Sequence, residues 1–190
     1  MIISSFDEMS NLARKVANLT NAQYSKITSK KFPDGDSYIK LEKNPQNKTF
    51  VIIVSFAQNP NTKIIETILA AKTAKDLGAK KIILVATYLP YMRQDARFNN
   101  YEAISAKIIL PLLAHNVGEL IAIDPHLHRV KRLEEISSNA HSITSNNSVP
   151  INITYSGKVE KFILDWNGTN ETMNNTNSSN GLLVNKTGLA

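Results

Sequence analysis

The sequence predicts an α/β fold built on a mainly parallel β-sheet. Two segments, 50–54 and 82–86, are continuous apolar runs, as is typical of strands that are buried on both faces. An amphipathic segment of helical period lies between them, and a second helical segment follows the second run. Strand–helix–strand–helix–strand order at this spacing favours right-handed βαβ crossovers, which align the strands in parallel.

The first part of the chain adds shorter elements to this pattern. Residues 2–6 are a short β-rich opening, and residues 7–19 place their apolar side chains on one helical stripe. A strand is expected over 25–32. Residues 32–36, with the order Phe-Pro-Asp-Gly-Asp, are typical of a turn. The apolar residues within 38–41 then suit another strand.

The central elements follow in the order given above. Gly78 ends the first of the two helices, because glycine is common just past a helix C-terminus. Pro111 lies within the second helix, where it should kink the helix or shift its boundaries. The expected bounds are strand 49–56, helix 61–77, strand 80–87, helix 102–116 and strand 118–124.

Beyond about residue 136 the periodic pattern decays. Between residues 167 and 180, 11 of 14 residues are Asn, Ser or Thr, which is too polar to build a core. We therefore expect a single folded domain over residues 1–148 and a divergent, partly disordered polar tail over residues 149–190.

Composition limits the function. The 190 residues include no cysteine, which argues against disulfide scaffolds, thiolate metal sites and cysteine nucleophiles. The apolar runs are too short to span a membrane, and no secretory leader is visible, so a cytoplasmic protein is expected. The formal net charge is +6, and the whole excess lies in residues 1–150. This charge suits an anionic partner such as a nucleotide. A nucleic acid is disfavoured, because the strands are aliphatic and lack interleaved aromatic and basic residues.

Polar clusters follow two of the expected strands, at the sheet edge where α/β proteins bind ligands. The segment 88–98 contains Arg93, Gln94 and Asp95 among aromatic residues. Arginine binds phosphate oxygens through its planar fork, and aromatic or amide groups recognise purine rings. The second cluster contains His126 and lies at the end of strand 118–124. Imidazole is a common ligand of transition metals, whereas Mg²⁺ prefers oxygen donors. By spacing alone, His126 is as consistent with an ordinary loop histidine as with a ligand.

Several motifs of other nucleotide-binding and hydrolytic enzymes are absent from the sequence. It contains no G-x-x-x-x-G-K-[ST], no G-x-G-x-x-G and no G-x-S-x-G. P-loop kinases, dinucleotide-binding folds with that fingerprint and serine hydrolases are therefore poorly supported.

Four segments, in this order and spacing, resemble the ribose-phosphate pyrophosphokinase family. Residues 32–36 (FPDGD) resemble its F-x-D-G-E segment, and residues 90–95 (PYMRQD) resemble P-Y-x-R-Q-D. Residues 102–107 (EAISAK) resemble E-P-I-[ST]-A-K, and residues 124–126 (DPH) resemble D-x-H. The resemblance covers residues 1 to about 135, which correspond to the family's N-terminal domain. It implies a phosphoribosyltransferase-like, Rossmann-like fold.

The resemblance also implies an activity and roles for the matched residues. The family transfers the β,γ-diphosphoryl group of ATP to the C1 hydroxyl of ribose 5-phosphate, for nucleotide biosynthesis. His126 would help to bind the Mg²⁺ that accompanies ATP, and the turn would reach a nucleotide across a subunit interface of a homo-oligomer. No catalytic residue is assigned in this chain. The residues implied in ATP binding are Phe32, Asp34, Gly35, Asp36, Arg93, Gln94 and Asp95.

The sequence also departs from the family pattern. Asp36 stands where the family has Glu, and the 190 residues contain neither the catalytic Lys/Arg loop nor the paired aspartates that bind ribose 5-phosphate in the family's second domain. We therefore expect a chain that supplies the ATP-binding half of the enzyme and is inactive by itself. The alternative is a catalytically silent, nucleotide-binding partner or regulator of a complete synthase.

Overall fold

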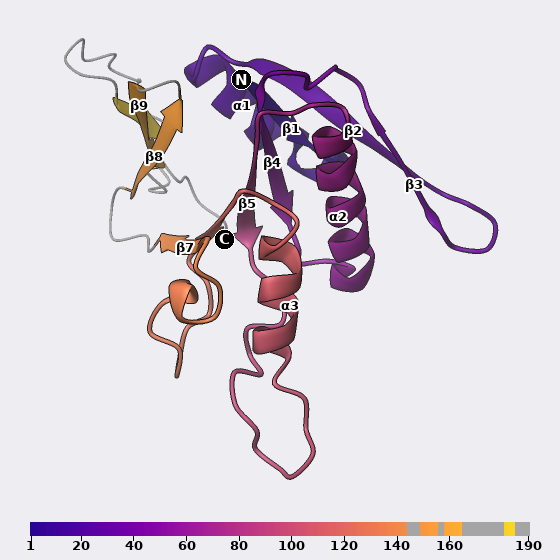
Figure 1. Cartoon of the computed structure of the whole chain (residues 1–190), viewed down its shortest axis with the longest axis vertical. Helices are drawn as coiled ribbons and strands as arrows, with labels where there is room; N and C mark the ends of the chain where they lie inside the picture. Colours follow the sequence, from indigo (N-terminus) through magenta and orange to yellow (C-terminus); the bar gives the residue numbers. More distant parts are fainter. Residues whose placement is uncertain (144–148, 156–157, 165–180, 185–190) are drawn as a thin grey trace. The chain divides into compact units, whose positions relative to one another are not determined.

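The computed structural model describes residues 1–143, 149–155, 158–164 and 181–184. The chain divides into two compact units, Met1–Ser142 and Ile143–Ala190. The first unit contains nearly all of a seven-stranded sheet, which Figure 1 shows with its helices. The expected α/β fold is confirmed. The assignment of domains 1–148 and 149–190 stays a prediction.

The sheet has the strand order β3-β2-β1-β4-β5-β6-β7. Five neighbouring strands, from β2 to β6, are parallel, and β3 pairs with β2 in the antiparallel sense. Because β1 and β4 are adjacent, the chain builds the sheet outward from them in both directions. The strands are β1 (Ile2–Ser5), β2 (Gln23–Lys31), β3 (Ser37–Leu41), β4 (Thr49–Ser55), β5 (Lys81–Tyr88), β6 (Glu119–Ile123) and β7 (Ala140–Ile143).

Three α-helices connect the parallel strands. α1 (Ser10–Leu19) follows a 3-10 turn at Asp7–Met9 and packs against β1 and β2. α2 (Pro60–Asp76) contacts β3, β4 and β5, and α3 (Ser105–Ala114) contacts β6. A second 3-10 turn spans Leu133–Glu135.

Two helix ends show how local sequence sets the boundaries. Gly78 has a φ of +81°, and its N–H donates to the carbonyl of Lys75 over 3.0 Å, as expected for a glycine that ends a helix. The second helix begins at Ser105 and not at residue 102, so the expected start was three residues too early. Glu102 belongs to the preceding loop, to which its side chain is bonded. Pro111 lies inside α3 without ending it.

The core lies between the sheet and the helices α2 and α3. Alternate residues of β4 and β5 enter one apolar cluster, for example Phe50, Ile52 and Leu84. The residues between them, such as Val51 and Ile83, are buried as well. The expected burial of these strands on both faces is therefore confirmed. Small residues of α2 let its backbone approach the sheet closely: Ala70, Ala71 and Ala74.

The second unit contains a separate three-stranded sheet. β9 (Lys158–Leu164) is antiparallel to β8 (Val149–Tyr155) and parallel to β10 (Gly181–Val184). These strands were not expected from the sequence, although residues 149–155 alternate largely between apolar and polar types, which is the period of a strand. The disorder expected for residues 167–180 lies outside the described residues. In the part of the chain that the structure describes, no helix has the length and apolar character needed to cross a membrane.

Candidate functional site

The candidate site lies at the carboxyl edge of the parallel sheet. β5 and β6 are paired in parallel from Ile83 and Glu119 to Ala86 and Ala122, so both strands deliver their following loops to the same edge. The loop between β5 and α3 covers residues 89–104 and extends well beyond the sheet (Figure 1). The loop after β6 begins at Asp124. This edge is where open α/β sheets bind their ligands.

Asp95 joins these two loops. One of its carboxylate oxygens, Oδ1, accepts a hydrogen bond from Arg129 Nη1 at 2.8 Å, and the other, Oδ2, accepts one from the Arg129 backbone N–H at 3.1 Å. The Asp95 side chain is only 3% exposed, whereas that of Arg129 is 55% exposed. Burial acts to raise the pKa of Asp95, but the hydrogen bonds and the positive charge of Arg129 together hold that pKa below its ordinary value.

The two residues before Asp95 are placed differently. Arg93 is exposed to solvent, which leaves its guanidinium accessible to an anionic ligand. Gln94 is half-buried, and its carbonyl accepts a hydrogen bond of 3.2 Å from the N–H of Ala106 in the first turn of α3. The backbone of the segment is thus anchored at Gln94 and Asp95, while Arg93 faces the solvent.

Glu102 organises the outer part of the same loop. Its carboxylate accepts hydrogen bonds from the N–H groups of Phe98 and Asn99 at 3.0 and 3.1 Å, and from Asn99 Nδ2 at 2.6 Å. Its carbonyl accepts a hydrogen bond from Arg97 Nε at 2.8 Å. The bonds from Asn99 and Phe98 lower the pKa of Glu102. Residues 97–101 line an open pocket of about 740 Å³.

Unusual backbone conformations concentrate at this edge. Among the residues that the structure describes, six other than glycine have a positive φ, and four of these lie in segments that follow the carboxyl ends of parallel strands. Tyr91 is the clearest example, with a φ of 63°, and its hydroxyl is hydrogen-bonded to Oδ1 of Asn61 in α2. The other three are Asn59, Tyr101 and Asp124. Backbone strain of this kind collects at functional sites.

His126 is exposed in the loop after β6. Its ring lies against the ring of His128 in an edge-to-face arrangement, with 4.1 Å between the ring centroids. Within the described ranges, no group of three or more His, Cys, Asp or Glu side chains could hold a metal ion. The donors present therefore do not form a cage for a resident metal. The imidazoles of His126 and His128 do not complete a coordination shell by themselves, so an ion held here takes its other ligands from a substrate and water.

The turn at residues 32–36 is well ordered by its own hydrogen bonds. The Phe32 N–H donates to the carbonyl of Asp36 at 2.8 Å, and the Asp36 N–H donates to Asp34 Oδ1 at 3.1 Å. Gly35 has a φ of +95°, and all five residues of the turn are exposed. Figure 1 shows the β2–β3 hairpin projecting from the edge of the sheet, away from the loop between β5 and α3. The turn also leaves the sheet at the carboxyl end of a parallel strand, β2, but its hairpin projects away from the loop that carries Arg93, Gln94 and Asp95 (Figure 1).

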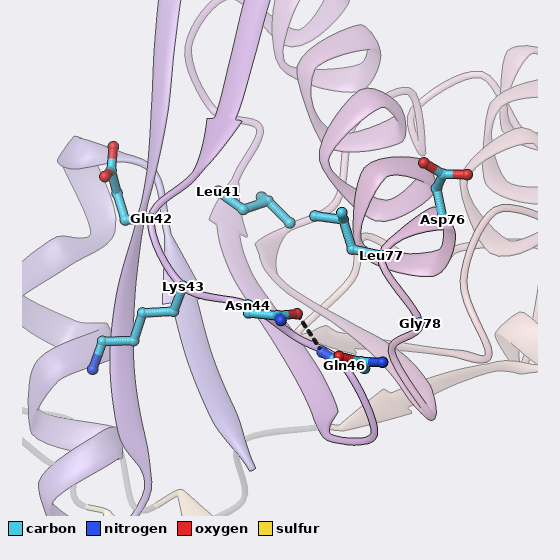
Figure 2. Close-up of a pocket in the computed structure, with 8 residues that line it drawn as sticks. All are labelled: Leu41, Glu42, Lys43, Asn44, Gln46, Asp76, Leu77 and Gly78. Carbon is cyan, nitrogen blue, oxygen red and sulfur yellow. Dashed lines mark hydrogen bonds between the residues drawn. The ribbon is translucent and has the colours of Figure 1, made fainter.

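A second pocket lies elsewhere, between the segment after β3 and the C-terminal end of α2. It has a volume of about 500 Å³, and Figure 2 shows Leu41 and Leu77 facing each other across it while Glu42 and Lys43 point away. None of the site residues expected from the sequence lines this pocket. We therefore assign it no part in the candidate site.

Sequence reasoning missed two residues that organise the site. Arg129 was one arginine among several, and Glu102 was noted only as part of a resembling segment. Asp95 and Arg129 are 34 positions apart, so only the fold reveals their contact, whereas Glu102 is bonded to residues three to five positions away. The single available signal for Arg129 was its position three residues after His126.

Comparison with known proteins identifies a family. Residues 1–118 match the family model described as the N-terminal domain of ribose phosphate pyrophosphokinase. A ribose-phosphate pyrophosphokinase from Saccharolobus solfataricus is 37% identical over 128 residues, which cover 66% of this chain and 44% of the relative. One from Sulfurisphaera tokodaii is 30% identical over 167 residues, which cover 86% of this chain and 56% of the relative.

The fold has a counterpart among solved structures. A phosphoribosylpyrophosphate synthetase from Mycobacterium smegmatis superposes with a TM-score of 0.67 at 18% identity, over 76% of this chain and 48% of that one. The chain spans about half the length of the curated relatives it matches. The family match covers well over half of the chain, and the fold and motifs agree with it. The chain therefore belongs to the ribose-phosphate pyrophosphokinase family and carries the part that corresponds to that family's N-terminal domain.

Proposed function

We propose that the chain supplies the ATP-binding half of a ribose-phosphate pyrophosphokinase. The observation that carries this proposal is the segment Arg93–Asp95 at the carboxyl edge of the sheet, in which an exposed guanidinium precedes a buried and doubly hydrogen-bonded carboxylate. Family membership supplies the reaction, because the matched relatives are named for it. We place the reaction in the cytoplasm, as part of nucleotide biosynthesis.

Each residue of the site has a role in this proposal. Arg93 binds phosphate oxygens of ATP, and the side chain of Gln94 adds a polar contact to the nucleotide. Asp95 does not touch ATP; it holds the loop in position through Arg129. The substrate is MgATP, whose ion takes ligands from phosphate oxygens and water, with His126 as the candidate protein ligand.

The proposed reaction displaces AMP from the β-phosphorus of ATP. The C1 hydroxyl oxygen of ribose 5-phosphate forms a bond to that phosphorus while the bond to the α,β-bridging oxygen breaks, and the hydroxyl proton is released. Such transfers depend on positioning and on neutralising phosphate charge more than on covalent chemistry by the protein. Arg93 supplies one fixed positive charge for this purpose. We assign no catalytic residue in this chain.

The turn at residues 32–36 has a separate role in the proposal. Phe32, Asp34, Gly35 and Asp36 contact a nucleotide held by a neighbouring subunit in a homo-oligomer. Two observations support this: the turn is exposed, and its hairpin projects away from the loop between β5 and α3 of the same chain (Figure 1). The aromatic ring of Phe32 is half-exposed and lies edge-on to the ring of Tyr38.

A catalytically silent partner or regulator is the second candidate function. It is favoured by a feature of the sequence, since the 190 residues contain no pair of adjacent aspartates to hold ribose 5-phosphate. Such a protein would bind MgATP and associate with a complete synthase. Assays of the purified chain with and without a complete family member separate the two functions. An increase in synthase output per active site without transfer by the chain itself would favour regulation.

Calorimetric titration with MgATP tests the binding site. We expect a dissociation constant in the micromolar to millimolar range, about −4 to −8 kcal/mol. Arg93→Ala should weaken binding by about 1.5–3 kcal/mol, the value of a hydrogen bond to a charged group. The matched control is Lys80→Ala, which removes one exposed positive charge at the opposite edge of the sheet and should leave the affinity nearly unchanged. Equal weakening by both variants would show that only net charge matters and would remove Arg93 from the site.

A further inference from the structure

Arg129 lies in the loop after β6 and contacts the loop after β5 at two separate points. Its backbone N–H and its Nη1 bind the two carboxylate oxygens of Asp95. Its guanidinium carbon also lies 4.9 Å from the centroid of the Phe98 ring. Asp95 and Phe98 flank Arg97, so one arginine contacts the loop on both sides of that residue.

Loss of the contact between Arg129 and Asp95 would destabilise the loop between β5 and α3. A carboxylate whose side chain is 3% exposed needs hydrogen bonds or a partner charge, because burial removes it from water. Arg129 supplies both, and its bonds to the two oxygens fix the orientation of the carboxylate. The backbone N–H remains in every side-chain variant, so the guanidinium contribution can be removed without removing the whole contact.

The Asp95–Arg129 pair connects the two segments that are proposed to bind MgATP. Asp95 directly follows Gln94 and Arg93, and Arg129 comes three residues after His126. The pair therefore joins the segment proposed to bind phosphate with the segment proposed to face the ion of MgATP. Two loops joined by a buried, charge-assisted contact do not lose their mobility independently. Restricting one loop lowers the conformational-entropy cost of restricting the other.

We propose that Arg129 is a positioning residue that transmits nucleotide binding at the β5–α3 loop to the loop after β6. This inference rests on the proposed function, because it requires that the nucleotide binds at Arg93 and Gln94. It gives Arg129 a role that differs from ligand binding. Contacts with the nucleotide restrict the remaining motion of residues 93–95, Asp95 then holds Arg129 more firmly, and the motion of residues 126–131 is restricted in turn.

Hydrogen exchange measured by mass spectrometry tests this transmission in the full chain. The probe is the α,β-methylene analogue of ATP with Mg²⁺, at concentrations that saturate each variant. In the unchanged chain the probe should slow exchange in peptides covering both 92–99 and 126–131. In Arg129→Gln the first segment should still be protected, while the protection of the second should fall several-fold. Arg129→Lys keeps the positive charge and a donor nitrogen, and should restore part of the protection of 126–131.

A matched control and two outcomes define what would overturn the inference. Arg132→Gln removes a neighbouring exposed charge and should behave like the unchanged chain. If Arg132→Gln lowers the protection of 126–131 as much as Arg129→Gln does, net charge carries the coupling and the inference is wrong. Full protection of both segments in Arg129→Gln would likewise overturn it.

The same experiment separates failure of the inference from failure of the proposed function. If the unchanged chain shows no protection of 92–99 by the probe, then the nucleotide does not bind there and the proposed function fails with the inference. If 92–99 is protected and 126–131 is not, in the unchanged chain, the binding site stands and only the transmission is refuted. Melting temperatures of the variants, measured in parallel, show whether each is folded.

Discussion

Asp95 and Arg129 show how two residues that are 34 positions apart determine the local chemistry of the site. The carboxylate is buried and would be unfavourable alone, but two hydrogen bonds from one arginine satisfy it. Glu102 stabilises the outer end of the loop in a similar way, because its carboxylate accepts hydrogen bonds from the N–H groups of Phe98 and Asn99. These contacts leave Arg93 as an exposed cation on a loop whose backbone is held in place.

The lowered pKa of Asp95 predicts an acid-sensitive loop. Because the folded-state pKa lies below the ordinary 3.8, the ionised carboxylate stabilises the folded loop fully above 3.8, and this contribution is lost as pH falls through the folded-state pKa. The carboxyl carbon resonance of Asp95, followed by NMR, should titrate with a midpoint below 3.8. In Arg129→Gln the midpoint should rise, since the side-chain bond and the charge are gone. An unchanged midpoint in that variant would show that Arg129 does not cause the shift.

At the scale of elements, the β2–β3 hairpin presents its turn through a backbone that needs glycine. Gly35 has a φ of +95°, and a Cβ at this position would meet no atom within 4 Å. A side chain there is therefore disfavoured by backbone conformation and not by crowding. The turn is also closed by the carboxylate of Asp34, which accepts a hydrogen bond from the Asp36 N–H.

Gly35→Ala should lower the free energy of unfolding by about 1–2 kcal/mol, the cost of a left-handed conformation for an ordinary residue. Gly35→Asn is the matched control and should cost less, because asparagine tolerates positive φ. Urea unfolding at equilibrium measures both values. Equal stability of all three proteins would mean that the turn changes conformation to accommodate the side chain.

At the scale of the whole molecule, the chain corresponds to about half of its relatives. Its described residues place one candidate nucleotide site at the carboxyl edge of the sheet, and its sequence contains no recognisable loop for ribose 5-phosphate. Holding two reactants together contributes on the order of 7–11 kcal/mol to barrier reduction. A site that fixes only ATP retains little of that contribution.

The purified 190-residue chain should therefore bind MgATP but form phosphoribosyl pyrophosphate at well below about 1 s⁻¹, the low end for typical enzymes. A coupled assay for the product measures the rate, and the complete enzyme from Saccharolobus solfataricus serves as the positive control. Weak hydrolysis of ATP by water is compatible with the expectation. Turnover above about 1 s⁻¹ by this chain alone would show that residues 137–190 contain an acceptor site.

The sequence by itself determined the α/β class, the parallel central strands, the helices between them and the family. Those features depend on local periodicity and on residues that are close in the chain, such as the apolar runs at 50–54 and 82–86 or the segment 90–95. It placed the start of α3 too early, because the hydrogen bonds that keep Glu102 in the loop are not visible in a helical pattern.

Only the tertiary structure decided which of the candidate residues lie together. It joined Asp95 to Arg129 and directed the β2–β3 hairpin away from the loop between β5 and α3, because contacts between distant segments depend on the order of strands in the sheet and on the loops at its edge. A hydrogen bond between residues 34 positions apart leaves no periodic trace in the sequence. The role proposed for Arg129 follows from its neighbours in space, and these cannot be read from the order of residues along the chain.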